Sequence, residues 1–147
     1  MSEVVFLTGV DDKLAFACRL LRKKYREGSR VAVFGPAPLL ARLDQALWTQ
    51  DDLEFLPHLR LRANAPVADA ARERTTLWLL DQADASLRCD SAVNLGSDEV
   101  EMIVSHARIA EIVASGPEER SAGQQRWKRY KALGHTLLHR PQDTPSA

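Results

Sequence analysis

The chain has few cysteines, no long apolar run and no excess of charge of either sign. Its 147 residues include two cysteines, Cys18 and Cys89, which are far apart and form no CxxC pair. A disulfide framework or a cysteine zinc site is therefore not indicated, and we expect reduced thiols. No apolar run approaches the roughly 18 residues of a membrane-spanning helix. The start, MSEVVFLTG, does not read as a signal peptide, so we expect a cytoplasmic protein with no membrane partner.

The net charge is zero, because 20 basic residues balance 20 acidic ones. Attraction of the whole protein to nucleic acid is therefore not indicated, and any such binding requires local segregation of charge. Segregation is present: no acid occurs between Arg120 and Arg140, whereas acids gather at residues 51–54 and 98–101. We expect one basic face and one acidic face on a single globular domain.

Sequence motifs of catalysis are missing. The turn at residues 35–38 follows a predicted strand, where a phosphate loop would lie, but neither GxGxxG nor GxxxxGK[ST] occurs. The two prolines of this turn also remove N–H donors that a phosphate needs. His135 and His139 are four residues apart, as metal ligands on a helix can be, but the glutamate of HExxH is missing and a solvated pair is favoured. We expect no catalytic residue, no metal and no cofactor, and an enzyme binding a nucleotide at the 35–38 turn is the least favoured function.

Short apolar runs alternate with helical patterns along the chain. Strands are predicted over 4–7, 31–34, 77–80, 92–95 and 109–113, and helices around 14–25 and 39–48 and over 99–106 and 117–139. This alternation predicts an α/β fold, a three-layer sandwich with a mostly parallel central sheet. Residues 4–34 are expected to form a right-handed strand-helix-strand unit. We expect a single domain over residues 1–140 and a flexible C-terminal tail over 141–147.

The most distinctive stretch is RWKRYKALG at residues 126–134, in which two aromatic residues alternate with four basic ones. Candidate contact residues share one face of a continuous helix, or lie beside that face: Trp127, Tyr130, Lys131, Gly134, Lys128 and Arg120. Such a surface would suit an extended acidic peptide, through charge-assisted hydrogen bonds to carboxylates. It would equally suit single-stranded nucleic acid, through stacking and cations. A solvated basic helix with its aromatic residues in the core is a third interpretation.

A second candidate surface surrounds the end of the predicted helix at 39–48. Trp48 ends this helix, and Phe55 and Pro57 follow in an acidic loop. Large apolar side chains at such positions either complete the core or face a protein partner. The residues themselves leave both possibilities open.

Four sequence blocks occur in a fixed order: YREGSRV at 25–31, LDQALW at 43–48, FLPH at 55–58 and RWKRYK at 126–131. Together they resemble the chi subunit of bacterial DNA polymerase III holoenzyme, over about residues 4–139 and least over 58–110. The resemblance implies a non-catalytic α/β subunit of the clamp-loader complex that functions in DNA replication. It also implies partners, namely the psi subunit and the acidic, apolar C-terminal tail of the single-stranded-DNA-binding protein. DNA would be contacted only indirectly, and a DNA-repair helicase could compete with psi.

The resemblance assigns roles to particular residues. The tail would meet Trp127 as an aromatic wall and Val113 as a floor, and its carboxylates would be held by three cations: Arg120, Lys128 and Lys131. Gln124 departs from the family pattern, because an arginine is expected there, and one charge contact is therefore weaker.

The patch that binds the psi subunit is carried over to Trp48, Phe55 and Pro57. With the resemblance taken into account, RWKRYKALG is interpreted as a pocket for an acidic protein tail. Direct binding of single-stranded nucleic acid by the basic C-terminal helix remains the alternative function.

Overall fold

The computed structural model describes residues 2–49, 57–61, 75–80 and 89–142. The strands in this part are β1 Glu3–Val10, β2 Val31–Phe34, β3 Leu59–Leu61, β4 Leu77–Leu80, β5 Ser91–Asn94, β6 Arg108–Ala114 and β7 Thr136–Pro141. The helices are α1 Lys13–Arg26, α2 Ala37–Thr49, α4 Val100–Ile103 and α5 Pro117–Ala132.

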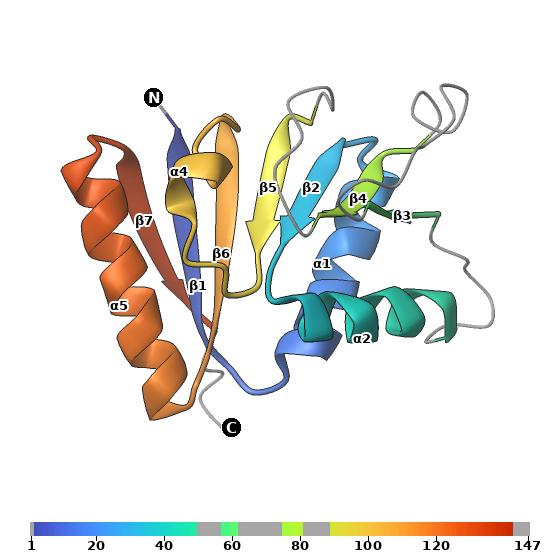
Figure 1. Cartoon of the computed structure of the whole chain (residues 1–147), viewed down its shortest axis with the longest axis horizontal. Helices are drawn as coiled ribbons and strands as arrows, with labels where there is room; N and C mark the ends of the chain where they lie inside the picture. Colours follow the sequence, from blue (N-terminus) through green and yellow to red (C-terminus); the bar gives the residue numbers. More distant parts are fainter. Residues whose placement is uncertain (1, 50–56, 62–74, 81–88, 143–147) are drawn as a thin grey trace.

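The seven strands form one sheet in the order β3-β4-β2-β5-β6-β1-β7. Every neighbouring pair is parallel. Helix α5 runs along the end of the sheet made by β6, β1 and β7, and α1 and α2 lie toward its other end (Figure 1). The predicted α/β fold with a parallel central sheet is therefore confirmed.

Successive side chains of the strands enter two separate cores, one on each face of the sheet. In β2, Val31 and Val33 join a core with α1 and α2, whereas Ala32 and Phe34 join a core with α4 and α5. Both sets are buried, which explains why the central strands read as continuous apolar runs. Each fully buried Val, Leu or Phe contributes about 1.5–3 kcal/mol, so the two cores hold the three layers together.

The structure differs from the predicted arrangement at the first strand-helix-strand unit. β1 and β2 are not neighbours, because β5 and β6 lie between them. The two strands missed in the sequence, β3 and β7, form the edges of the sheet. β3 has only three residues, and most residues of β7 are exposed, so their hydrophobic pattern is weaker than that of the central strands.

The last predicted helix, 117–139, is wrong at its end, because α5 stops at Ala132. Gly134 adopts φ +86°, a left-handed conformation that ends helices. The N–H of Gly134 donates to the Lys131 carbonyl, and the N–H of His135 donates to the Tyr130 carbonyl. The chain then turns back as β7, which pairs along the whole of its length with β1. His135 and His139 are therefore not on one helix, and the predicted helical pair does not exist.

Helices α1 and α5 leave neighbouring strands on opposite faces of the sheet. Helix α1 follows β1 and packs in the first core, whereas α5 follows β6 and packs in the second. Open α/β sheets bind ligands where successive connections diverge in this way, outside the carboxyl ends of the strands. The divergence between β1 and β6 is where the candidate site lies.

A second divergence, between β2 and β5, is closed by packing. A Cβ atom on Gly35 would lie 3.1 Å from Cβ of Leu95, and Lys13 donates through Nζ to the Leu95 carbonyl at 2.7 Å. Gly35, which follows β2, therefore packs directly against the end of β5, and the predicted turn is confined to the residues before α2, which begins at Ala37.

Candidate functional site

A groove of about 600 Å³ lies between α5 and the carboxyl ends of β1, β6 and β7. Its lining comes from all four elements and the residues that follow them: Phe6, Thr8, Gly9, Val113, Ser115, Arg120, Gly123, Gln124, Trp127, Lys128, His139 and Pro141. Since β1 lies at the other end of the chain from α5, only the folded chain brings this lining together.

The sequence explains why α5 forms next to this groove. Gly116 is the N-cap, Pro117 opens the first turn, and Glu118 and Glu119 place negative charge there. Inside the helix, Gly123 faces β6, and a Cβ atom there would lie only 3.0 Å from Cγ2 of Val113. The helix can therefore approach the strand closely enough for both to line one groove.

An aromatic cluster forms the wall of the groove. The rings of Phe6 and Trp127 meet edge to face, with centroids 5.0 Å apart. Behind them, Tyr130 packs on Phe6 in the same manner at 5.9 Å. Phe6 and Tyr130 are buried, whereas Trp127 is half-buried and is shared between core and groove. An apolar side chain entering the groove can therefore contact aromatic faces that are already fixed.

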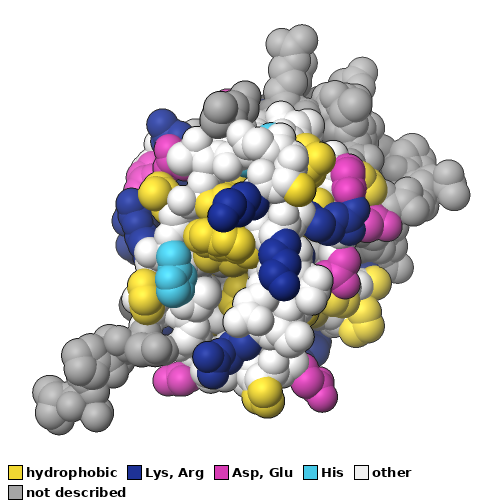
Figure 2. All heavy atoms as spheres, turned by 90° about the vertical axis from the view of Figure 1, so that its left-hand side faces the viewer, with side chains coloured by type: hydrophobic (Ala, Val, Ile, Leu, Met, Phe, Trp, Pro, Cys, Tyr) yellow, Lys and Arg dark blue, Asp and Glu magenta, His cyan; other side chains and the backbone are white. Residues whose placement is uncertain are grey.

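The rim of the groove is basic. Arg120 and Lys128 are exposed on α5 and both line the groove. The nearby carboxylate of Glu119 is already engaged, by the Lys13 ammonium and by the backbone N–H of Ala114. Figure 2 shows an apolar patch at the centre of this side of the molecule, with Lys and Arg side chains around it and acidic ones nearer the edge of the view. The groove therefore favours a ligand that carries an apolar group next to an anionic group.

The far wall of the groove is polar. Oγ1 of Thr8 lies 2.6 Å from Nε2 of His139. This side-chain contact joins β1 to β7 at the groove. Gln142 donates its backbone N–H to the Thr8 carbonyl at 2.7 Å, so the chain remains attached to β1 beyond the end of β7. Pro141, the last residue of β7, also lines the groove.

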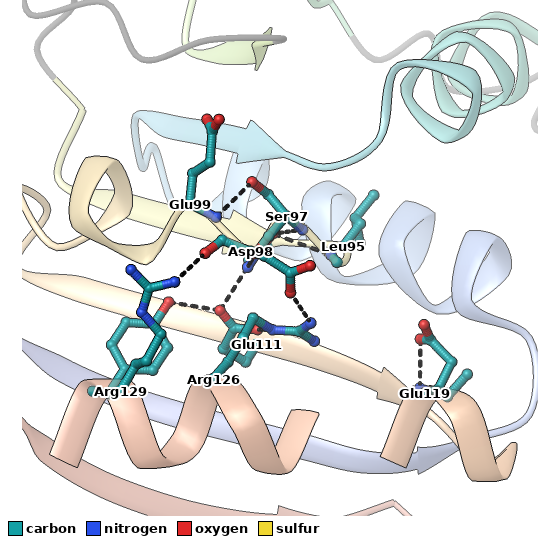
Figure 3. A network of polar contacts seen from close by, with 12 residues as sticks. Leu95, Ser97, Asp98, Glu99, Glu111, Glu119, Arg126 and Arg129 are labelled. Carbon is teal, nitrogen blue, oxygen red and sulfur yellow. Dashed lines mark hydrogen bonds and ion pairs between the residues drawn. The ribbon is translucent and has the colours of Figure 1, made fainter. Parts of the chain in front are cut away.

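Beneath α5 lies a buried polar network centred on Glu111, whose side chain is fully buried (Figure 3). Its Oε1 accepts from Nε of Arg126 at 2.8 Å. Its Oε2 accepts from the Tyr130 hydroxyl at 2.6 Å and from the Asn94 amide at 2.7 Å. Arg126 reaches on to Asp98 at 3.4 Å. This network connects β5, β6 and α5, and it fixes the rotation of α5 that turns Trp127 toward the groove.

The burial of this network changes the acidity of its members. Burial raises the pKa of Glu111, and the neighbouring Arg126 guanidinium opposes that rise. Burial and the Glu111 carboxylate both raise the pKa of Tyr130, so its hydroxyl remains a donor. Burial alone would lower the pKa of Arg126, but the charge of Glu111 reverses this and raises it. Both carboxylate oxygens of Glu111 have hydrogen-bond partners, and its buried contact with Arg126 suits a structural role.

The two cysteines lie outside the groove lining and are poor nucleophiles. Burial raises the pKa of the Cys18 thiol, and it raises that of Cys89 to about 11. Neither is a thiolate near neutral pH. Across the described residues there is no group of three or more His, Cys, Asp or Glu side chains placed to hold a metal ion. In the same part of the chain, no helix is long and apolar enough to cross a membrane.

The structure places four of the seven residues predicted for tail binding in the groove: Val113, Arg120, Trp127 and Lys128. Gln124 also lines the groove. Tyr130 is fully buried and binds Glu111, so it does not share an exposed stripe with Trp127. Lys131 is exposed beyond the groove lining, and Gly134 follows the helix end.

Sequence reasoning missed the buried network. It counted Arg126 among the basic residues of RWKRYKALG and did not predict its burial, whereas the side chain is 2% exposed. The available signal was Glu111, an acid within the apolar run at 109–113 that was correctly predicted as a strand. A carboxylate in a fully buried strand requires a cationic or hydrogen-bonding partner.

The second candidate surface lies at the end of α2. Trp48 is 56% exposed, and Pro57 is partly exposed beside the buried His58. Phe55, the third predicted residue of this patch, lies outside the described residues, as does the acid cluster at 51–54. Trp48 therefore does not complete the core, and it presents an indole at the surface.

Fold and groove together define a single-domain parallel α/β protein with a groove beside α5 near one edge of its sheet. The family model described as DNA polymerase III chi subunit, HolC, matches residues 1–138. The chain belongs to this family, as the sequence blocks predicted.

Named relatives and a solved structure agree with this placement at different levels. The chain is 28% identical over 128 residues to the DNA polymerase III subunit chi of Pseudomonas aeruginosa, covering 85% of this chain and 83% of that protein. It is 26% identical over 121 residues to the subunit of the same name in Escherichia coli K12, covering 82% and 79%. The C-terminal part of the Fun30 ATPase domain matches 76% of this chain and 44% of its own, with a TM-score of 0.58 and 13% identity. That last likeness shows the fold alone.

Proposed function

We propose that this chain is a non-catalytic accessory subunit of the clamp loader, which bridges the psi subunit and the C-terminal tail of the single-stranded-DNA-binding protein. Membership of the DNA polymerase III chi family supports a role in DNA replication. In this function one small domain binds two protein partners at the replisome, in the cytoplasm. The chain contacts DNA only indirectly, through the single-stranded-DNA-binding protein.

The groove on α5 is the observation that carries this proposal. Its floor and wall are apolar, through Val113, Phe6 and Trp127, and its rim carries Arg120 and Lys128. A peptide with an apolar side chain next to carboxylates matches both parts at once. Each hydrogen bond to a charged group contributes about 1.5–3 kcal/mol, which together with an inserted apolar side chain supports micromolar binding.

The shape of the charged surface favours a peptide over nucleic acid. The net charge is zero, and the cations Arg120 and Lys128 line the α5 side of a groove of peptide size. Nucleic acid binding draws most of its affinity from many phosphate contacts along a track of cations. Direct binding of single-stranded nucleic acid remains the alternative, because Trp127 and the cations of α5 could stack and pair with it.

A titration separates the two functions. A fluorescent peptide with the sequence of the single-stranded-DNA-binding protein's tail is titrated with the wild type, Trp127→Ala and Lys128→Glu, and anisotropy is read. Lys23→Glu, the same charge change at an exposed position on α1, is the matched control. Saturable micromolar binding that both groove variants lose and the control keeps would support the proposal. Binding of a single-stranded oligonucleotide with a steep salt dependence, and no peptide binding, would establish the alternative.

The psi subunit is proposed to bind at Trp48, Phe55 and Pro57. The exposed indole of Trp48 supports this, because tryptophan is enriched among residues that dominate interface energies. Trp48→Ala should prevent co-elution with the psi subunit on size-exclusion chromatography, and Leu133→Ala, at another exposed apolar residue, should not. A DNA-repair helicase that uses the same patch should be displaced by psi. Co-elution of Trp48→Ala with psi would refute this assignment.

A further inference from the structure

A buried imidazole lies directly beneath the exposed tryptophan at the end of α2. The His58 side chain has no exposed surface, and its Nε2 is 2.7 Å from Oδ1 of Asp44 on α2. Trp48 lies one turn further along the same helix, with its ring centroid 5.3 Å from that of His58 and the planes tilted by 57°. A carboxylate thus orients an imidazole, and the imidazole supports an indole.

The contact gives the exposed indole a buried surface to rest on. Trp48 is 56% exposed at the last turn of α2, and the buried His58 ring lies against it. Contact with a ring that cannot itself rotate favours one orientation of the indole. Immobilising a side chain on binding costs about 0.5–1.5 kcal/mol, so a side chain held in place beforehand binds more tightly.

Two sequence blocks that carry the family resemblance meet at this contact. Asp44 and Trp48 belong to LDQALW, and His58 ends FLPH. The His58 side chain is buried and that of Asp44 is partly exposed, whereas the indole lies outside. One structural unit therefore accounts for the aspartate and the histidine as well as for the tryptophan.

We propose that Asp44 and His58 are positioning residues, which hold Trp48 in the orientation that inserts into an apolar pocket of the psi subunit. The inference rests on the proposed function, because it takes Trp48 as a contact of that partner. Neither Asp44 nor His58 needs to touch the partner for this role. Substituting either residue should therefore weaken psi binding by making the Trp48 indole less ordered.

The first test combines affinity with a measurement of indole motion. Affinity for the psi subunit of the same organism is measured by calorimetry, and the indole N–H of Trp48 is followed by heteronuclear NOE. The Trp48 signal is assigned by its loss in Trp48→Phe, since the chain has three tryptophans. His58→Ala should weaken psi binding by about 2- to 13-fold, as expected if ordering one side chain becomes part of binding, and should lower the NOE. Tail-peptide affinity should not change.

A pair of variants at Asp44 separates positioning from folding. Asp44→Ala removes the hydrogen-bond partner of His58, whereas Asp44→Asn retains an acceptor oxygen and should restore binding to near the wild-type level. Asp44 is only about one-third exposed in its side chain, so thermal unfolding of each variant is recorded alongside. Gln45→Ala, at the exposed neighbour, is the control for effects of the helix surface.

The outcomes distinguish the inference from the function on which it rests. If Trp48→Ala binds psi as well as the wild type, both the psi patch and the positioning role are refuted. If Trp48→Ala loses binding while folded His58→Ala and Asp44→Ala bind normally with an ordered indole, only the positioning role is refuted. Equal weakening by Asp44→Ala and Asp44→Asn would also overturn it.

Discussion

Two tryptophans occupy the two proposed partner surfaces, and the molecule holds them in different ways. Trp127 is half-buried in the wall of a groove, where it packs on Phe6. Trp48 is more than half exposed at the end of a helix and rests on His58. A tryptophan in a groove wall suits a partner that inserts a side chain, whereas a protruding tryptophan suits a partner that supplies the pocket. The two proposed partners would therefore meet different surfaces of one small domain and would not compete for either.

The supports beneath the two tryptophans also differ. Under α5, Glu111 and Arg126 form an ion pair in which both side chains are almost completely buried. Under α2, only His58 of its pair is buried, and Asp44 remains partly in water. Removing one member of a buried ion pair leaves an uncompensated charge, whereas a partly hydrated carboxylate can still be solvated. Removing a member of the Glu111–Arg126 pair should therefore lower the stability of the whole fold. Removing a member of the Asp44–His58 pair should mainly affect the order of the Trp48 side chain.

Glu111→Ala should have the largest effect, because it leaves Arg126 buried opposite a cavity. We expect the free energy of unfolding to fall by about 3–5 kcal/mol, measured by urea denaturation. Glu101→Ala, which removes the exposed partner of Arg129, should change it by less than about 1 kcal/mol. The loss in free energy of unfolding for Asp44→Ala should lie between those for Glu111→Ala and Glu101→Ala. A loss for Glu111→Ala as small as that for Glu101→Ala would show that the network does not support α5.

Replacing each tryptophan should next separate the two surfaces. We expect Trp127→Ala to weaken tail-peptide binding by about 30-fold or more, corresponding to the roughly 2 kcal/mol of a dominant interface residue, and to leave psi binding unchanged. Trp48→Ala should do the reverse. Both affinities are measured by calorimetry on each variant. If either substitution reduced both affinities equally, the two surfaces would not be independent.

Most of the fold follows from the sequence, because the central strands are buried on both faces. The runs at 31–34 and 77–80 are apolar throughout and bounded by turn residues, and both are strands at those residues. Edge strand β7 could not be found in this way, since most of its residues are exposed and its leucines also fit a helix. The informative residue was Gly134, which was predicted to lie on the face of a continuous helix and instead ends it.

The candidate site was predictable only in part, for a physical reason. The helical pattern of residues 117–132 identifies Trp127 and Lys128 as candidates, because both lie on α5. It cannot find Phe6 or His139, which reach the groove from β1 and β7 through sheet pairing. Nor does a run such as RWKRYK indicate which of its cations is buried, because that depends on Glu111, 15 residues earlier. Long-range pairing, and not local pattern, decides these positions.

Gly123→Ala should alter the groove while leaving the Trp48 surface as it is. The new methyl group would lie 3.0–3.1 Å from both Cγ atoms of Val113, so α5 must move away from β6. We expect a loss of about 1–3 kcal/mol in stability, as for other overpacked positions, together with weaker peptide binding. Gly116→Ala, where nothing lies within 4 Å of the new Cβ, is the control. Val113→Ala in the same chain should restore part of the stability, and no recovery would argue against the steric explanation.

Gln124→Arg should have the smallest effect. It should raise the affinity for the tail peptide and leave psi binding unchanged. Gln124 is exposed, lines the groove, and stands where the family resemblance leads us to expect an arginine. An added cation at the rim should raise tail-peptide affinity by about 2- to 5-fold, in line with exposed ion pairs of up to about 1 kcal/mol. The gain should shrink as salt rises, because exposed charges are screened. Gln125→Arg adds the same charge at the next exposed residue, outside the groove lining. If both variants gained equally, the tail would respond to the overall charge of α5, and the groove would not define where its carboxylates bind.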